Sequence, residues 1–156
     1  MDSVNSSTHT ITSLNDLDVF AFLLSHTLKG GDIVALKGEM GAGKTTLTQF
    51  LAKHLGCVES ITSPTYVLVK TYPMNSNTIQ LLCHMDAWRL DEHSNLSSVI
   101  DEEELGHPHS LAIIEWPERI TLTTQPSVVI EIKKEKGSEQ RTITLTRVRE
   151  PLTDEK

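Results

Sequence analysis

The stretch LKGEMGAGKTTLTQFLAKHLG, residues 36–56, contains glycines, lysines and threonines at a spacing that can bind phosphate groups. The pattern G-x-x-x-x-G-K-[ST] is satisfied by Gly38, Gly43, Lys44 and Thr45. Glycines let the backbone curl so that its N–H groups surround a phosphate. We expect Lys44 to reach the β- and γ-phosphates of a nucleotide, the Thr45 hydroxyl to ligate Mg²⁺, and Thr46 to lie near the α-phosphate. The helix that follows contributes only about 0.3–1 kcal/mol, so the N–H bonds, the ammonium and a metal must supply most of the binding.

Two acidic residues end apolar segments downstream of this loop. Asp86 ends the segment TIQLLCHMD, and Glu115 ends LAIIE. In an open α/β sheet, functional side chains gather at the carboxyl ends of the strands, where the loop also lies. A γ-phosphate needs an acid near its metal and a group that positions the attacking atom. The pair therefore predicts a catalytic set.

A further candidate lies in the stretch TSPTY, residues 62–66, where Ser63, Pro64 and Thr65 predict a stiff turn that carries hydroxyl groups. At this position, nucleotide switches commonly carry a threonine that senses the γ-phosphate and its metal. An ordinary Ser-Pro turn explains the same residues equally well. Thr65 is therefore a candidate switch residue, with the plain turn as its alternative.

The elements that must position these residues can be predicted from local patterns. Ser13, with Asp16 three positions later, predicts a helix start, and apolar residues at helical spacing continue this helix toward a pair of glycines. A buried strand is predicted over residues 32–37 and a helix over 44–55, closed by Gly56. The other predicted elements are strands over 66–72, 78–88 and 110–116, a helical region over 91–105, and an antiparallel hairpin of 127–134 with 140–148.

These segments predict one α/β domain over residues 10–148, with a P-loop NTPase-like mixed sheet, mostly parallel, flanked by helices and ending in a C-terminal antiparallel hairpin. The polar residues 1–9 are expected to be disordered and residues 149–156 to form a flexible tail. The apolar runs fall far short of the roughly 20 residues that span a bilayer, and the N-terminus lacks the features of a signal peptide. A cytoplasmic location without membrane association is expected.

The charge of the chain restricts its partners. The net charge is −7, from 14 basic and 21 acidic residues, whereas a protein that binds nucleic acid unaided usually presents a basic surface. The densest charge run is acidic, DEEE at residues 101–104, and fits either a solvated helix start or a contact for a basic partner. Neither the two cysteines nor the HPH stretch at 107–109 has the spacing of a zinc site. Strong direct binding of tRNA or DNA is not expected.

Four motifs in a fixed order resemble a known family: GEMGAGKTT (38–46), TSPTY (62–66), HMDAWR (84–89) and IIEWPER (113–119). Over about residues 14–120 the chain is similar to the bacterial TsaE (YjeE) family of P-loop ATPases. The resemblance implies ATP and Mg²⁺ as ligands, and as partners the threonylcarbamoyl-transferring enzyme TsaD with its companion TsaB. Together these proteins form threonylcarbamoyladenosine (t6A) beside the anticodon of tRNAs that read codons beginning with A. The tRNA would be reached only indirectly, through the complex.

The same resemblance implies roles for individual residues. Nucleotide contacts are implied for Gly41, Ala42, Gly43, Lys44, Thr45, Thr46, Thr65 and Trp116. Metal contacts are implied for Thr45, Glu115 and Asp86, and catalytic roles for Asp86, Glu115 and Lys44. For Trp116, a core position or an adenine-side contact is the simplest interpretation, and for Arg89 a surface ion pair. Trp88 and Glu39 replace the Tyr and Asp of many relatives, which are conservative departures.

Three functions fit these residues: an accessory ATPase that resets the TsaB–TsaD complex between turnovers, an ATP-gated binding module of that complex without obligatory hydrolysis, and a small-molecule P-loop kinase. Asp86 and Glu115 favour the first, because binding alone needs only one acid at the metal. Kinases usually add a lid with several arginines, and Arg89 is the only arginine in residues 62–105. Since no arginine finger is evident in the chain itself, we expect weak hydrolysis by the isolated protein and activation by the complex.

Overall fold

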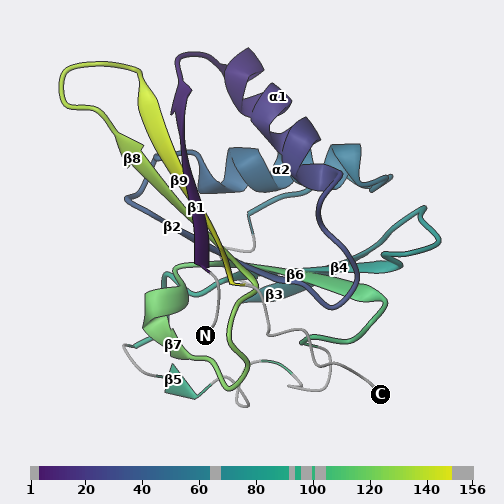
Figure 1. Ribbon diagram of the computed structural model, residues 1–156. Coiled ribbons are helices and arrows are strands. Elements are labelled where there is room, and N and C mark those ends of the chain that lie inside the picture. The colour runs from purple at the N-terminus through teal and green to yellow at the C-terminus, as the bar shows by residue number, and fades with distance from the viewer. Residues whose placement is uncertain (1–3, 64–67, 92–93, 96–99, 101–104, 149–156) are drawn as a thin grey trace.

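Figure 1 shows the computed structural model, which describes residues 4–63, 68–91, 94–95, 100 and 105–148. Within these residues, seven strands form one sheet in the order β1-β9-β8-β2-β6-β4-β3. The bounds are β1 Val4–Ile11, β2 Ile33–Gly38, β3 Val69–Pro73, β4 Leu81–Asp86, β6 Ser110–Glu115, β8 Val128–Lys134 and β9 Arg141–Val148. The central strands β8, β2, β6 and β4 are parallel, and β3, β9 and β1 add antiparallel edges. The predicted mixed sheet with its C-terminal hairpin is confirmed.

Two helices, α1 (Leu14–Ser25) and α2 (Lys44–His54), lie together on one face of this sheet (Figure 1). The core beneath them includes Leu17, Leu24, Leu47, Leu51, Leu82 and Ile113. On the opposite face, Ile33, Met85 and Ile114 are buried together with Ile120. Ile120 begins the short strand β7 (Ile120–Thr121), which follows the 3-10 turn η3 (Pro117–Arg119). Strand β7 pairs with another short strand, β5 (Ser94–Asn95). Because both faces are covered, β2 and β6 are almost continuously apolar.

The ends of the two helices follow the predicted signals. The Ser13 hydroxyl oxygen accepts a hydrogen bond from the N–H of Asp16 at 3.1 Å, which confirms the predicted cap of α1. The Asp16 carboxylate accepts from the N–H of Thr12 at 2.8 Å, one residue before the donor used in a standard capping box. At the end of α2, Gly56 has a φ of 94°, the left-handed conformation expected of a glycine after a helix. None of the helices that the structure describes is long and apolar enough to cross a bilayer.

The N-terminus differs from the prediction. Residues 4–9 were expected to be disordered, but they belong to β1, which pairs with β9 along its whole length from Val4 with Val148 to Ile11 with Arg141. Most β1 side chains are exposed, which explains their polar composition. Ile11 at its end is buried in the core, but backbone hydrogen bonds of the ladder, not burial of side chains, hold the rest of this strand, and threonine favours the strand conformation.

Parts of the other predictions fall on residues outside the structural description. The helical region expected over 91–105 is wrong for residues 94–95, which form β5, while 92–93, 96–99 and the acidic run 101–104 are not described. The first residues of the strand expected over 66–72 are also outside it, and the observed strand β3 begins at Val69. The tail 149–156 stays a prediction.

Candidate nucleotide-binding site

The glycine-rich loop connects the carboxyl end of β2 to the start of α2, as its sequence predicts. Gly41 and Gly43 have φ angles of 78° and 115°, in the left-handed region that a side chain would disfavour. Gly43 is the N-cap of α2, and it offers no side chain to cap the first turn of the helix. The N–H groups of this turn therefore remain suited to an anion such as a phosphate.

Lys44 is the first residue of α2, and its side chain folds back over the loop. The Nζ atom donates hydrogen bonds to the carbonyl oxygens of Gly38 at 2.5 Å and Glu39 at 2.9 Å. It also lies 4.3 Å from the centroid of the Trp116 ring, a cation–π contact. Burial lowers the pKa of the Lys44 ammonium, and nearby carboxylates, Glu115 first, oppose that shift. The structure thus holds a partly desolvated positive charge inside the loop.

Thr45, Glu115 and His84 form a line of hydrogen bonds beneath the loop. The Thr45 hydroxyl donates to Oε1 of Glu115 at 3.0 Å, and Oε2 of Glu115 lies 2.7 Å from Nε2 of His84. Glu115 is 2% exposed and His84 is fully buried. Because the Thr45 hydroxyl gives its hydrogen to the carboxylate, its oxygen lone pairs remain available to a cation.

Asp86 lies at the carboxyl end of β4, directly opposite Glu115 on the neighbouring strand β6. Its Oδ1 accepts a hydrogen bond from the N–H of Trp88 at 3.0 Å. Burial raises the pKa of Asp86; the N–H of Trp88 opposes the shift, and the carboxylate of Glu115 adds to it. The two predicted acids therefore meet at one edge of the sheet, as parallel neighbouring strands require.

The Thr45 hydroxyl, with Glu115 as its hydrogen-bond partner, suits a Mg²⁺ ion that is bound together with phosphates. No group of three His, Cys, Asp or Glu side chains within the described part of the chain is arranged to hold a metal by itself. Mg²⁺ usually keeps only one or two protein ligands and takes the remaining ones from water and substrate phosphates. The Thr45 hydroxyl, backed by Glu115 and close to the loop, matches that requirement.

Trp116 follows Glu115 directly and adopts a left-handed conformation with φ 58° and ψ 52°. Such a conformation costs a residue other than glycine about 1–3 kcal/mol and is often found at functional sites. Its N–H donates to the carbonyl oxygen of Leu36 in β2 at 3.2 Å, and its ring centroid lies 4.4 Å from that of Trp88. The ring also lies beside the Lys44 ammonium.

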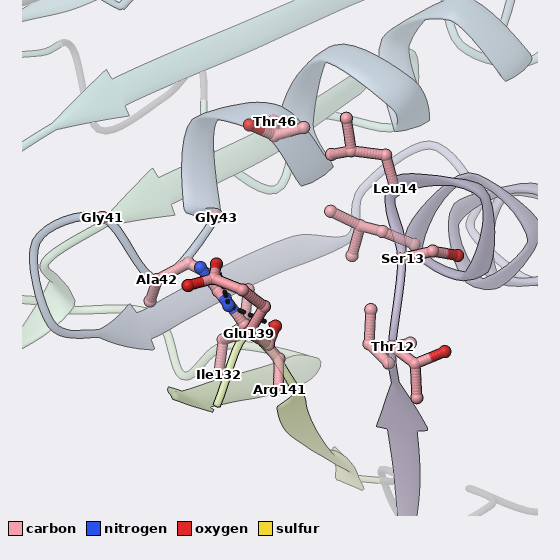
Figure 2. A pocket seen from close by; sticks show the side chains of 12 residues that line it. Thr12, Ser13, Leu14, Gly41, Ala42, Gly43, Thr46, Ile132, Glu139 and Arg141 are labelled. Carbon is pink, nitrogen blue, oxygen red and sulfur yellow. Dashed lines mark hydrogen bonds and ion pairs between the residues drawn. The ribbon is translucent and has the colours of Figure 1, made fainter. Parts of the chain in front are cut away.

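A cavity of about 260 Å³ opens on another side of the loop (Figure 2). Its walls come from the start of α1, the loop with the first turn of α2, and the β8–β9 hairpin: Ile11, Thr12, Ser13, Leu14, Leu17, Gly41, Ala42, Gly43, Thr46, Ile132, Glu139 and Arg141. Arg141 joins two of these walls, since its Nε donates to the carbonyl oxygen of Ala42 at 3.3 Å and its guanidinium pairs with Glu139. The C-terminal hairpin, in which the sequence shows no motif, thus contributes to the walls of this cavity.

A family model described as threonylcarbamoyl adenosine biosynthesis protein TsaE matches residues 5–143. The chain belongs to the TsaE family. Several curated relatives have the name "tRNA threonylcarbamoyladenosine biosynthesis protein TsaE". The relative from Bacillus subtilis is 32% identical, and the match covers 77% of this chain and 72% of the relative. The relative from Streptomyces coelicolor is 35% identical, and the match covers 79% of this chain and 84% of the relative. The TsaE protein of a Nostoc species is 37% identical, and the match covers 78% of this chain and 75% of the relative.

The fold agrees with the family. The crystal structure of Bacillus subtilis YdiB superimposes with a TM-score of 0.70 at 26% identity, covering 94% of this chain and 88% of that one. The predicted family and the predicted fold are therefore confirmed, and the chain has a role in tRNA threonylcarbamoyladenosine biosynthesis. It is a P-loop protein of a nucleotide-binding type.

Most of the predicted TsaE site residues are described, and they fall into two groups. Beside Trp116 the structure brings together Lys44, Thr45, Asp86 and Glu115. The cavity side carries Gly41, Ala42, Gly43 and Thr46. Thr65 lies in residues 64–67, outside the structural description, so its switch role stays a prediction. Sequence reasoning missed His84, although a histidine two residues before Asp86 must lie on the same face of its strand.

Proposed function

We propose that this TsaE chain binds ATP with Mg²⁺ and hydrolyses it to reset a TsaB–TsaD complex between turnovers of tRNA modification in the cytoplasm. The observation that carries this proposal is the hydrogen bond of the Thr45 hydroxyl to Glu115, next to the Lys44 ammonium. A loop that only held a nucleotide would not need two buried or half-buried carboxylates at the same strand ends. Glu115 and Asp86 supply both an acid behind the metal ligand and a second acid for the attacking water.

Each residue has a distinct part in this proposal. Mg²⁺, when bound, would neutralise charge on the β- and γ-phosphates. Thr45 would ligate it, and Glu115 would fix the Thr45 hydroxyl through the bond at 3.0 Å. Lys44 would turn from its backbone carbonyl partners toward the phosphates, while Asp86 would orient water. Asp86 suits that role, because an aspartate with a raised pKa accepts a proton more readily than an ordinary one.

The cavity beside the loop is the proposed site for the nucleoside of ATP. It adjoins Thr46, which the phosphate-binding pattern places near the α-phosphate, and about 260 Å³ is close to the lower end of the roughly 300–1,000 Å³ typical of small-molecule sites. The side chain of Leu14 forms part of its wall (Figure 2). A nucleoside there would contact both α1 and the C-terminal hairpin.

The Leu14→Ser substitution tests this placement. We expect it to lower the affinity for ATP about threefold to tenfold, because part of an apolar contact is lost. The affinity for inorganic tripolyphosphate should not change. Leu23→Ser is the matched control, since Leu23 is 62% exposed and Leu14 68% exposed on the same helix. Isothermal titration calorimetry measures both ligands, and an equal loss for ATP and tripolyphosphate would exclude a nucleoside in this cavity.

The proposed partner complex is tested by hydrolysis. The isolated chain should hydrolyse ATP slowly, because a charge missing from the site can be supplied by a partner. Adding the TsaB–TsaD pair should accelerate phosphate release at least tenfold, whereas adding tRNA alone should not. If repeated rounds of tRNA modification proceed with a non-hydrolysable ATP analogue, hydrolysis is not required, and the chain is an ATP-gated binding module instead.

A further inference from the structure

His84 is a buried polar residue that the proposed mechanism has not used. It lies in β4, opposite Ile113 of β6, and is fully buried. Its Nε2 atom is 2.7 Å from Oε2 of Glu115, while Nδ1 is buried without a hydrogen-bond partner among the described residues. A buried polar atom without a partner disfavours the folded state, and an apolar side chain at this position would avoid that cost. Packing alone therefore does not account for a histidine here.

The histidine does account for the geometry of Glu115. A carboxylate accepts hydrogen bonds and cannot donate them, so the Nε2–H group of His84 must be the donor. A glutamate side chain has three rotatable bonds, and burial alone does not choose among its rotamers. The bond from His84 fixes Oε2, and with Oε2 fixed, Oε1 faces the Thr45 hydroxyl at 3.0 Å, closer than Oε2 at 3.4 Å.

We propose that His84 is a positioning residue of the metal site: its Nε2–H group holds Glu115 in the orientation that fixes the Thr45 hydroxyl for Mg²⁺. This inference rests on the proposed function. His84 acts two hydrogen bonds away from the cation and touches neither the nucleotide nor the metal. The nearest comparable precedent in protein chemistry is the outer-shell residue that orients a metal ligand, whose loss typically weakens metal binding by about 10–100-fold.

Three substitutions separate positioning from packing. His84→Leu removes the donor, His84→Gln can place an N–H donor where Nε2 lies, and His84→Asn carries a similar amide that is too short to reach Glu115. For each, the affinity for the β,γ-imido analogue of ATP is measured calorimetrically in EDTA and across a series of Mg²⁺ concentrations. We expect the Mg²⁺ concentration for half-maximal gain in affinity to rise at least fivefold in the Leu and Asn variants. The Gln variant should stay within twofold of wild type, and the affinity in EDTA should be unchanged in all three.

The outcomes distinguish this inference from the proposed function. If wild type depends on Mg²⁺ and the Leu or Asn variant shows the same dependence, His84 does not position the site, and the proposed function stands. Equal behaviour of the Gln and Asn variants also overturns the inference, and this comparison holds even if the Leu variant fails to fold. A wild-type chain whose affinity ignores Mg²⁺ would overturn the proposed function and this inference together.

Discussion

Replacing Lys44 with methionine is expected to abolish ATP hydrolysis and to weaken ATP binding by about tenfold to a hundredfold. A hydrogen bond to a charged group contributes about 1.5–3 kcal/mol, and each 1.4 kcal/mol corresponds to a factor of ten. The Lys44 ammonium is the positive charge that the structure holds inside the phosphate-binding loop. Methionine keeps the length and the apolar contacts of the stem but removes the charge. Hydrolysis is measured by phosphate release and binding by calorimetry.

The stability of the Lys44→Met variant provides an internal check. Burial lowers the pKa of Lys44, which means that the folded state disfavours the ammonium form; this penalty is present at every pH below the lowered pKa. Methionine removes it, so the melting temperature without nucleotide should equal or exceed that of wild type at pH 7. At the same ATP concentration, ATP should raise the melting temperature of the variant less than that of wild type, because the variant binds ATP more weakly.

A matched control uses another lysine of the same helix. Lys53 lies in the last turn of α2, and its exposed side chain pairs with Asp18 at 3.6 Å. Lys53→Met should leave hydrolysis and the ATP-induced thermal shift unchanged. A Lys44→Met chain that still shows the full thermal shift with ATP would refute the assignment of this loop.

Glu115→Gln is expected to lower partner-stimulated hydrolysis by about 10–100-fold while ATP remains bound, because Glu115 orients the metal ligand Thr45. The carboxylate accepts from Thr45 on Oε1 at 3.0 Å and from His84 on Oε2 at 2.7 Å, and the amide has an acceptor oxygen at only one of these two positions, so it cannot keep both bonds at these distances. The same loss should lower the melting temperature of the nucleotide-free chain, because one buried polar contact is no longer satisfied. Single-turnover hydrolysis with the TsaB–TsaD pair measures the first effect, and thermal unfolding measures the second.

Asp86→Asn makes the informative comparison, because its effect on stability should have the opposite sign. A raised pKa in the folded state means that folding disfavours the Asp86 carboxylate, so the penalty appears as pH rises above the unfolded pKa of about 3.9. Asparagine removes that penalty and keeps the oxygen that accepts from Trp88. The variant should melt above wild type at pH 7, with the difference shrinking toward pH 4, and should hydrolyse ATP more slowly. If both variants destabilised the chain equally, the two acids would not have the different environments described above.

The features of this protein that depend on neighbours along the chain could be predicted from local patterns. The glycine pattern from Gly38 to Gly43 predicted a phosphate-binding loop, because only local backbone geometry and the following helix are needed for it. Ser13 predicted the start of α1 for the same reason. Asp86 and Glu115 were predicted to lie at the carboxyl ends of strands, on the edge of the sheet that carries the loop, and the structure places them there on neighbouring strands.

Contacts between residues that are distant along the chain depend on the fold, and local patterns did not predict them. The bond between His84 and Glu115 joins residues 31 positions apart, and no local pattern distinguishes a buried histidine with a carboxylate partner from an exposed one. The cavity likewise combines Leu14, Ala42 and Arg141, whose proximity depends on how α1 and the C-terminal hairpin pack around the loop. The strand β1 was missed because its stability comes from backbone pairing with β9, which composition does not record. Local signals thus determine the elements and the loop, whereas the partners of Glu115 and the walls of the cavity are decided by long-range packing.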